Sequence, residues 1–157
     1  MLSRLFFHKS FQCSIVLAIC FVCTQQVISQ PIKVACVGNS ITFGAFIEDR
    51  VHNSYPAQLA SMLGDKYEVG NFGRSGATLL KDGNTPYWET NQYQEALDFN
   101  PDWVFIKLGT NDTKPFNRIH IEENFLEDYR DLVQSFGDLP SKPKVVLLLP
   151  VPVFRED

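Results

Sequence analysis

The sequence has few cysteines, and most of them stand close to the N-terminus. Cys13, Cys20 and Cys23 lie in the first segment, which leaves Cys36 alone in the rest of the 157 residues. A single cysteine forms neither a disulfide framework nor a cysteine metal cluster. Cys36 sits in a strand-like apolar run, where we expect it to be a small buried residue of the core. We expect no metal and no cofactor.

The chain also has no excess of positive charge. It holds 14 Lys and Arg against 18 Asp and Glu, a net charge of −4. Without Arg4 and Lys9, which precede the part that we expect to fold, the net charge is −6. Nucleic-acid-binding domains carry clustered basic residues, so this balance argues against a nucleic-acid partner. The segment 38–44 has neither the P-loop motif nor the three-glycine dinucleotide fingerprint, so no phosphate site is predicted there.

No apolar run approaches the roughly 20 residues that a helix needs to cross a bilayer. The run 13–23 follows two basic residues and ends near small residues, with a cut expected before Gln30. This pattern predicts a signal peptide over residues 1–29, export to the periplasm or the extracellular space, and no stable membrane span after cleavage. An uncleaved anchor is one alternative. A lipid-modified Cys20 is another, and the bulky residue before it argues against that.

Beyond residue 29 the sequence alternates between runs rich in β-branched residues and stretches with helical periodicity. This alternation predicts βαβ units around a parallel sheet, in one domain of which we expect residues 30–157 to be the N-terminal part. The predicted strands are continuous apolar runs, as expected for a sheet covered on both faces. They span 32–37, 67–71, 103–108 and 145–149, and the predicted helices span about 56–64, 92–99 and 121–136.

Local signals mark the ends of these helices. Pro56 suits the first turn of the first helix and Gly64 its C-terminal end, while Gly137 is the predicted end of the last helix. Met62 falls, with two leucines, on the face that we expect to cover the sheet. The fourth strand is the last predicted element, and no helix follows to cover it. We therefore expect an incomplete sheet of about four strands.

A serine stands at the end of the first predicted strand, in Gly38-Asn39-Ser40-Ile41-Thr42. Ligands of open α/β sheets bind at the carboxyl ends of parallel strands, so Ser40 stands where a nucleophile is useful. An equal alternative is that the Ser40 hydroxyl simply caps a helix.

The next two strands also end in small or polar residues. The second leads into residues 71–76, where Gly76 either lets the backbone approach a ligand or simply forms a turn. The third leads into Gly109-Thr110-Asn111-Asp112, where the Asn111 amide either faces a developing negative charge or forms an Asx turn. Three consecutive strands that deliver such residues to one edge of a sheet favour a site.

These blocks resemble those of the SGNH/GDSL hydrolases. Residues 38–42 resemble the family's Gly-Asp-Ser-Ile/Leu-Thr block, residues 109–112 resemble its Gly-x-Asn-Asp block, and the order is the same. The resemblance covers essentially all of the chain after the first segment and implies a three-layer α/β/α sandwich with a flavodoxin-like parallel sheet. It implies Ser40 as nucleophile and an oxyanion hole made of the backbone N–H groups of Ser40 and Gly76 and the side-chain amide of Asn111. The implied reactions are hydrolysis of carboxylic esters, including sugar acetates, lysophospholipids and acyl thioesters.

Two features depart from the family's pattern. Asn39 stands where the family usually has Asp, which alters the charge beside the nucleophile without removing a catalytic atom. The family's catalytic Asp and His lie three residues apart near its C-terminus, and we expect this chain to lack that Asp-x-x-His block. His52 and His120 do not match the family's position. A serine without a base is a poor nucleophile at neutral pH, so we expect little or no esterase activity from the chain as written, and activity from a longer protein.

Other residues near these blocks have two interpretations each. Arg74 and Asn39 are candidate substrate-binding residues, and a solvated loop is the alternative for Arg74. Asp112 is predicted to be a structural partner of the nucleophile loop rather than a catalytic acid. Tyr87 and Trp88 either line a sugar site or anchor a loop.

Three functions compete at this point. The first is an exported ester hydrolase, whose expected partner is a small-molecule or carbohydrate ester, acetylated carbohydrate above all. The second is a non-catalytic domain that keeps the pocket and binds a carbohydrate or acyl ligand. The third is a flavodoxin-like binding module that resembles esterases only at its strand ends.

Overall fold

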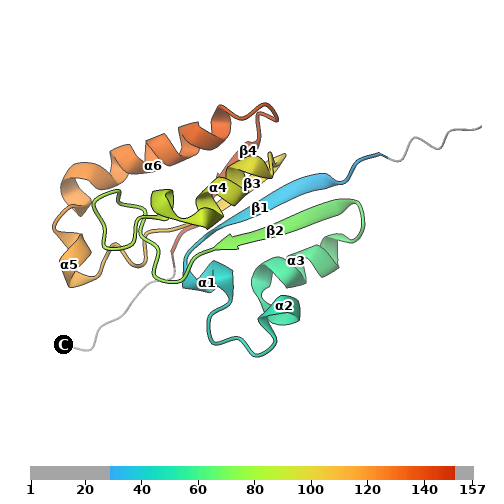
Figure 1. Cartoon of the computed structure of the whole chain (residues 1–157), viewed down its shortest axis with the longest axis horizontal. Coiled ribbons are helices and arrows are strands. Elements are labelled where there is room, and N and C mark those ends of the chain that lie inside the picture. Colours follow the sequence, from blue (N-terminus) through green and yellow to red (C-terminus); the bar gives the residue numbers. More distant parts are fainter. Residues whose placement is uncertain (1–28, 151–157) are drawn as a thin grey trace, which may run out of the picture.

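A four-stranded parallel sheet forms the centre of the protein in a computed structural model that describes residues 29–150. The strands are β1 (Ile32–Gly38), β2 (Tyr67–Gly73), β3 (Trp103–Lys107) and β4 (Lys144–Leu147), in the order β2-β1-β3-β4 (Figure 1). The predicted parallel sheet is confirmed. The predicted signal peptide lies, but for one residue, outside the described residues.

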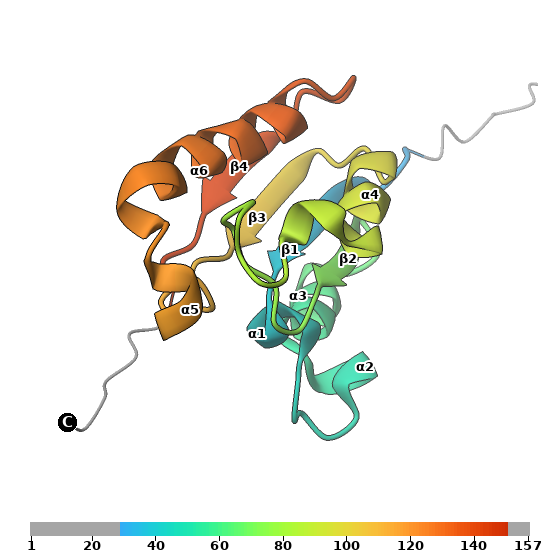
Figure 2. The same cartoon turned by 60° about the vertical axis from the view of Figure 1, so that its left-hand side comes forward.

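Helices cover the sheet in two layers. On one face lie α1 (Ser40–Phe43), α2 (Arg50–Asn53) and α3 (Tyr55–Leu63), and on the other lie α4 (Asn91–Asp98) and α6 (Ile121–Gly137). Figure 2 shows α4 in front of β1 and β2, and α6 beside β4. Two further short helices are present: η1 (Tyr87–Glu89) lies between β2 and α4 in the chain, and α5 (Pro115–Arg118) lies between β3 and α6. The three-layer α/β/α arrangement is thus the one predicted.

The main core lies between the sheet and the layer formed by α4 and α6. Alternate residues of the strands point into it, because successive side chains of a strand face opposite ways. Its fully buried members include Val37, Val104 and Ile106 from the sheet and Leu132 and Phe136 from α6.

On the opposite face, Cys36 is buried as predicted. The pKa of its thiol is raised to about 11, because the effect of burial outweighs the opposite effect of a hydrogen bond with Tyr55. The thiol is therefore neutral at physiological pH and packs as a small apolar group.

The helix ends follow the sequence signals only in part. Pro56 lies in the first turn of α3, and Gly64 ends that helix with a positive φ of 69°, as predicted. Met62 is 79% exposed, so its predicted contact with the sheet is wrong: nine residues of helix present only a narrow stripe to the strands. The last helix ends at Gly137, within one residue of the predicted end, but the left-handed glycine cap is absent: Gly137 is the last residue of α6, and Asp138 follows as the C-cap in a right-handed conformation.

Aromatic residues occupy the α3-side face of β3. Trp103 and Phe105 stack with ring centroids 6.4 Å apart and an interplanar angle of 12°. The ammonium of Lys144, on the neighbouring strand β4, lies 4.7 Å from the centroid of the Trp103 ring. Within the part of the chain that the structure describes, Figure 2 shows α3 behind β1 and β2 rather than behind β3 and β4.

Candidate functional site

Ser40 is the first residue of α1 and follows β1 directly. The preceding residue, Asn39, is the N-cap: its side-chain oxygen accepts the backbone N–H of Ile41 at 3.0 Å. Asn39 is only 1% exposed, so its side chain has a structural role. Since Asn39 supplies the cap, the capping alternative for the Ser40 hydroxyl has no support. Ser40 is half-buried at the carboxyl end of the central strand.

The loop after β2 packs directly on the loop after β1. The backbone N–H of Arg74 donates to the carbonyl of Gly38 at 2.9 Å. Gly73 lies so close to the backbone of Phe43 that a Cβ at this position would overlap it. Glycine is therefore required here, because only a residue without a side chain allows the two loops to approach this closely.

The loop after β3 completes the contact. The side-chain amide of Asn111 donates to the carbonyl of Ala77 at 2.9 Å, and Asn111 is 7% exposed. Gly76, one residue before Ala77, has a φ of +83° and open space where a Cβ would stand. The structure thus brings the loops of Ser40, Gly76 and Asn111 to one edge of the sheet. The side-chain amide of Asn111 has two N–H donors. It donates one of them to the carbonyl of Ala77, which leaves the second for another acceptor.

Asp112 holds the loop that follows Gly76. It is fully buried, and its two carboxylate oxygens accept the backbone N–H groups of Leu79 at 3.1 Å and Leu80 at 2.8 Å. Burial raises the pKa of this carboxyl, while the two backbone hydrogen bonds lower it. The structural role of Asp112 was predicted, but its partner is the loop after β2 and not the nucleophile loop.

Asn117 joins two loops of this edge, and no sequence pattern predicts this role. It is 1% exposed; its amide donates to the carbonyl of Asn111 at 2.9 Å and to the side chain of Asn84 at 2.9 Å. Its oxygen accepts the backbone N–H of Asn84 at 2.9 Å. A lone Asn in a short helix has no periodic or motif signal, so only the fold reveals this contact.

Tyr87 and Trp88 anchor the same loop. Tyr87 is fully buried, and its hydroxyl donates to the carbonyl of Phe72 at 2.7 Å. The indole N–H of Trp88 donates to the carbonyl of Leu79 at 2.7 Å. Of the two predicted alternatives, loop anchoring is therefore the correct one.

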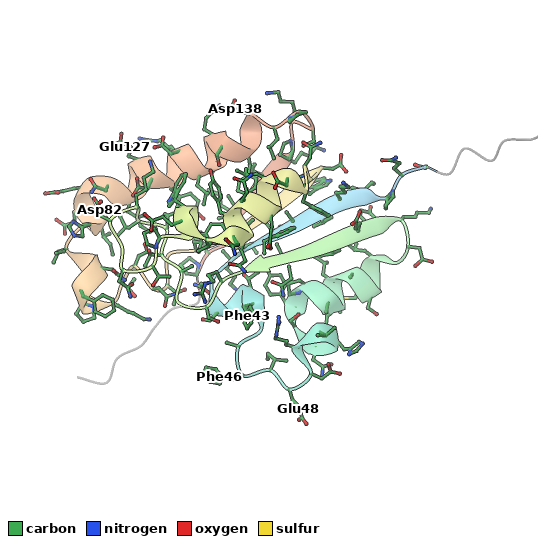
Figure 3. The ribbon with its side chains drawn as sticks, viewed as in Figure 1. Phe43, Phe46, Glu48, Asp82, Glu127 and Asp138 are labelled. Carbon is green, nitrogen blue, oxygen red and sulfur yellow. The ribbon has the colours of Figure 1, made fainter. Side chains whose placement is uncertain are left out.

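The expectation that the chain lacks an Asp-x-x-His spacing is wrong, because Asp49-Arg50-Val51-His52 has it. Nδ1 of His52 lies 2.8 Å from the Asp49 carboxylate, and the side chains are 77% and 57% exposed, respectively. This pair lies at the start of α2, beside α3, whereas Ser40 opens α1 at the end of β1 (Figure 1). The connection between α1 and α2 projects outward, with Phe46 and Glu48 at its outer side (Figure 3).

No hydrogen bond among residues 29–150 joins a histidine to Ser40. His52 bonds to Asp49, and the imidazole of His120, at the N-terminal end of α6, makes no hydrogen bond within these residues. The same residues contain no cluster of His, Cys, Asp and Glu suited to a metal ion. None of their helices is long and apolar enough to cross a membrane.

Comparison with known proteins identifies relatives of most of the described region. The model of the GDSL-like Lipase/Acylhydrolase family matches residues 36–157. An acetylxylan esterase from Xylanibacter ruminicola is 42% identical over an alignment 141 residues long, and the match covers 79% of this chain and 29% of that protein. The crystal structure of a carbohydrate acetylesterase family member from Sinorhizobium meliloti has a TM-score of 0.57 at 21% identity, covering 78% of this chain and 64% of that one. The chain thus spans less than a third of the curated relative that it matches.

Proposed function

Because the chain belongs to the GDSL-like Lipase/Acylhydrolase family, we propose that it carries the nucleophile and oxyanion hole of a hydrolase that removes acetyl groups from carbohydrate. The substrate class comes from the relative, which is named for acetylxylan. One observation carries the proposal: the loops of Ser40, Gly76 and Asn111 meet at one sheet edge through the bonds from Arg74 to Gly38 and from Asn111 to Ala77.

In the proposed reaction the Ser40 oxygen attacks the ester carbonyl. A C–O bond forms, the carbonyl electron pair moves onto its oxygen, and a base takes the serine proton. The backbone N–H groups of Ser40 and Gly76 and the Asn111 amide stabilise this oxyanion; one such donor is worth roughly 3 kcal/mol in a preorganised site. When the carbonyl re-forms, the bond between the acetyl carbon and the sugar oxygen breaks, and the sugar oxygen takes the proton from the base and leaves as a hydroxyl group. Water then attacks the acetyl-serine, the bond to the Ser40 oxygen breaks, acetate is released and the proton returns to Ser40.

The base is the part of this mechanism that the described residues do not supply. His52, an exposed residue of α2, is hydrogen-bonded to Asp49, and no hydrogen bond among residues 29–150 joins it to Ser40. The free hydroxyl of serine is a weak nucleophile without such a base. The proposal therefore includes little or no esterase activity for the 157 residues alone.

Chemical rescue tests the proposed nucleophile. We expect imidazole, added as an external base, to accelerate hydrolysis of 4-nitrophenyl acetate by the chain above the rate with Ser40→Ala, whose rate gives the uncatalysed background. Ser61→Ala, which changes an exposed serine of α3, is the matched control and should behave as the unchanged chain. Equal rates for the chain and Ser40→Ala at every imidazole concentration, together with fluorophosphonate labelling that survives Ser40→Ala, would exclude Ser40 as nucleophile.

We also propose that the protein is exported. The support is the order of basic residues, apolar run and small residues in the first 29 positions. Expression in a bacterial host, followed by mass spectrometry of the periplasmic and medium fractions, should find a chain that begins at Gln30. Recovery of only the intact chain from the cytoplasm would contradict export.

A further inference from the structure

A polar pocket lies beside the candidate oxyanion loop. It has a volume of about 460 Å³, within the usual range for small-molecule sites. Its lining comes from three parts of the chain, namely Arg74, residues 84–86 and residues 89–92. Of its lining residues only Pro86 is apolar.

The lining residues Asn84, Thr85 and Thr90 are held in place by bonds to buried groups. Both the backbone N–H and the side chain of Asn84 bond to Asn117, which is 1% exposed. The carbonyl of Thr85 accepts the backbone N–H of Thr78 at 2.9 Å. The hydroxyl of Thr90 donates to the carbonyl of Tyr87 at 2.6 Å. These bonds preorganise the wall, which reduces the entropy lost when a ligand binds.

The side chains that line the pocket suit a neutral polyhydroxyl ligand. Arg74 offers planar N–H donors, Glu89 offers two acceptor oxygens, and the amides of Asn84, Asn91 and Gln92 offer both. Adjacent hydroxyls of a sugar ring donate and accept in the same way. The guanidinium and the carboxylate balance each other in charge, so the pocket has no net attraction for an anion such as phosphate or a uronic acid.

The position of the pocket relates it to the ester bond. Its wall residue Arg74 is two residues before Gly76 and bonds through its backbone to Gly38, two residues before Ser40. A sugar whose acetyl group lies at Ser40 therefore has the pocket at its side.

We propose that this pocket binds a neutral sugar residue of the acetylated carbohydrate, with Arg74 and Glu89 as its principal hydrogen-bonding groups. This assignment rests on the proposed function for its link to Ser40. The binding itself does not need the ester, so it can be measured with a sugar that carries no acetyl group.

Titration of the ¹⁵N-labelled chain with xylotriose tests the proposal. We expect amide shifts at Asn84 and along residues 89–92, in the unchanged chain and equally in Ser40→Ala. Calorimetry should show about tenfold weaker binding for Arg74→Gln and for Glu89→Gln, because each loses a charge-assisted hydrogen bond. Arg130→Gln and Glu68→Gln, which change exposed residues outside the pocket, are the matched controls and should leave the affinity unchanged.

Several results would overturn the assignment. Shifts confined to other residues, no binding at millimolar xylotriose, or equal affinity of all four variants would each do so. Tighter binding of trigalacturonate than of xylotriose would show that the pocket prefers an acidic sugar to a neutral one. The shift map of the unchanged chain decides the matter even where a variant does not fold.

The two proposals fail in different ways. If xylotriose does not bind but imidazole rescues hydrolysis in a Ser40-dependent manner, the pocket assignment falls and the proposed function stands. If xylotriose binds at residues 84–92 but Ser40 shows no reactivity, the chain is a carbohydrate-binding fragment of the fold.

Discussion

At the scale of single residues, buried polar side chains fix the loops that surround Ser40. Asn39, Asn111, Asp112 and Asn117 are all buried, and each hydrogen-bonds a backbone group of this edge. A buried polar group costs free energy unless it is paired, so each of these residues stabilises one loop conformation over others. The positions of the candidate oxyanion donors therefore depend on residues that do not touch a substrate.

Asp112 offers a test with a pH dependence. The folded carboxyl has a raised pKa, so it binds its proton more tightly than the unfolded one. Its contribution to stability is full below the unfolded pKa and is lost as the pH rises through the folded pKa. Asp112→Asn keeps one acceptor of two and should lower the free energy of unfolding by about 1 to 3 kcal/mol.

Urea unfolding at pH 3 and pH 7 should show that the unchanged chain exceeds Asp112→Asn in stability by less at pH 7. A gap that widens toward pH 7 would mean that the pKa of Asp112 is lowered in the fold.

At the scale of elements, α6 stabilises the fold through one of its faces. Leu132 is fully buried and Leu126 is 62% exposed, although both are leucines of the same helix. Leu132→Ala should lower the free energy of unfolding by about 2 to 5 kcal/mol, because apolar burial is lost and a cavity is left behind. Leu126→Ala should lower it by no more than about 0.5 kcal/mol. Chemical denaturation followed by circular dichroism measures both. Comparable losses would show that α6 is docked by a different face.

The close contact between α1 and the end of β2 can be tested by comparing alanine substitutions of two glycines, Gly73 and Gly137. A Cβ at position 73 would overlap the backbone of Phe43, whereas at position 137 it would meet open space within a helix. Gly73→Ala should therefore lower the free energy of unfolding by more than about 2 kcal/mol, since the backbone at Phe43 has to move. Gly137→Ala should be neutral or stabilise by up to about 1 kcal/mol, because alanine favours a helix over glycine. Thermal unfolding of the two variants is the measurement, and a stable Gly73→Ala would refute the close approach.

The long elements could be predicted from the sequence, and the short ones could not. Strands β1 to β4 and helices α3, α4 and α6 were predicted to within a few residues, because apolar runs and helical periodicity extend over several turns or pleats. Helices α1, α2 and α5 have four residues each, too few for any periodicity. Met62 was predicted to face the sheet but is exposed, because a helix of nine residues packs only a narrow stripe against the strands.

At the scale of the whole molecule, one buried cluster joins the sheet to α4 and α6. A single core of this kind predicts one cooperative unfolding transition. The fluorescence of Trp88, which packs against this core, and of Trp103, on the other face, should change at the same urea concentration as the far-ultraviolet circular dichroism. Two separated midpoints would indicate that the two faces of the sheet unfold independently.

The candidate site was predictable as three strand ends but not as a pocket. Residues 38–42 and 109–112 were found because short blocks of small and polar residues follow apolar strands. The pocket was not, since it combines Arg74 with residues 84–92, which no motif connects. Asp49 and His52 have the family's Asp-x-x-His spacing, but they lie in the first third of the chain and not at the expected C-terminal position.

The order of the strands determines where the chain should tolerate insertions and deletions. Ser40, Gly76 and Asn111 follow β1, β2 and β3, and β1 pairs with both β2 and β3, so the backbone hydrogen bonds of the sheet fix the spacing of the three strand ends. The segments between these strands leave from the carboxyl edge and return at the opposite one. Insertions or deletions in the α1–α2 connection should therefore be tolerated, and such changes could reshape the surroundings of the serine while the geometry around it persists.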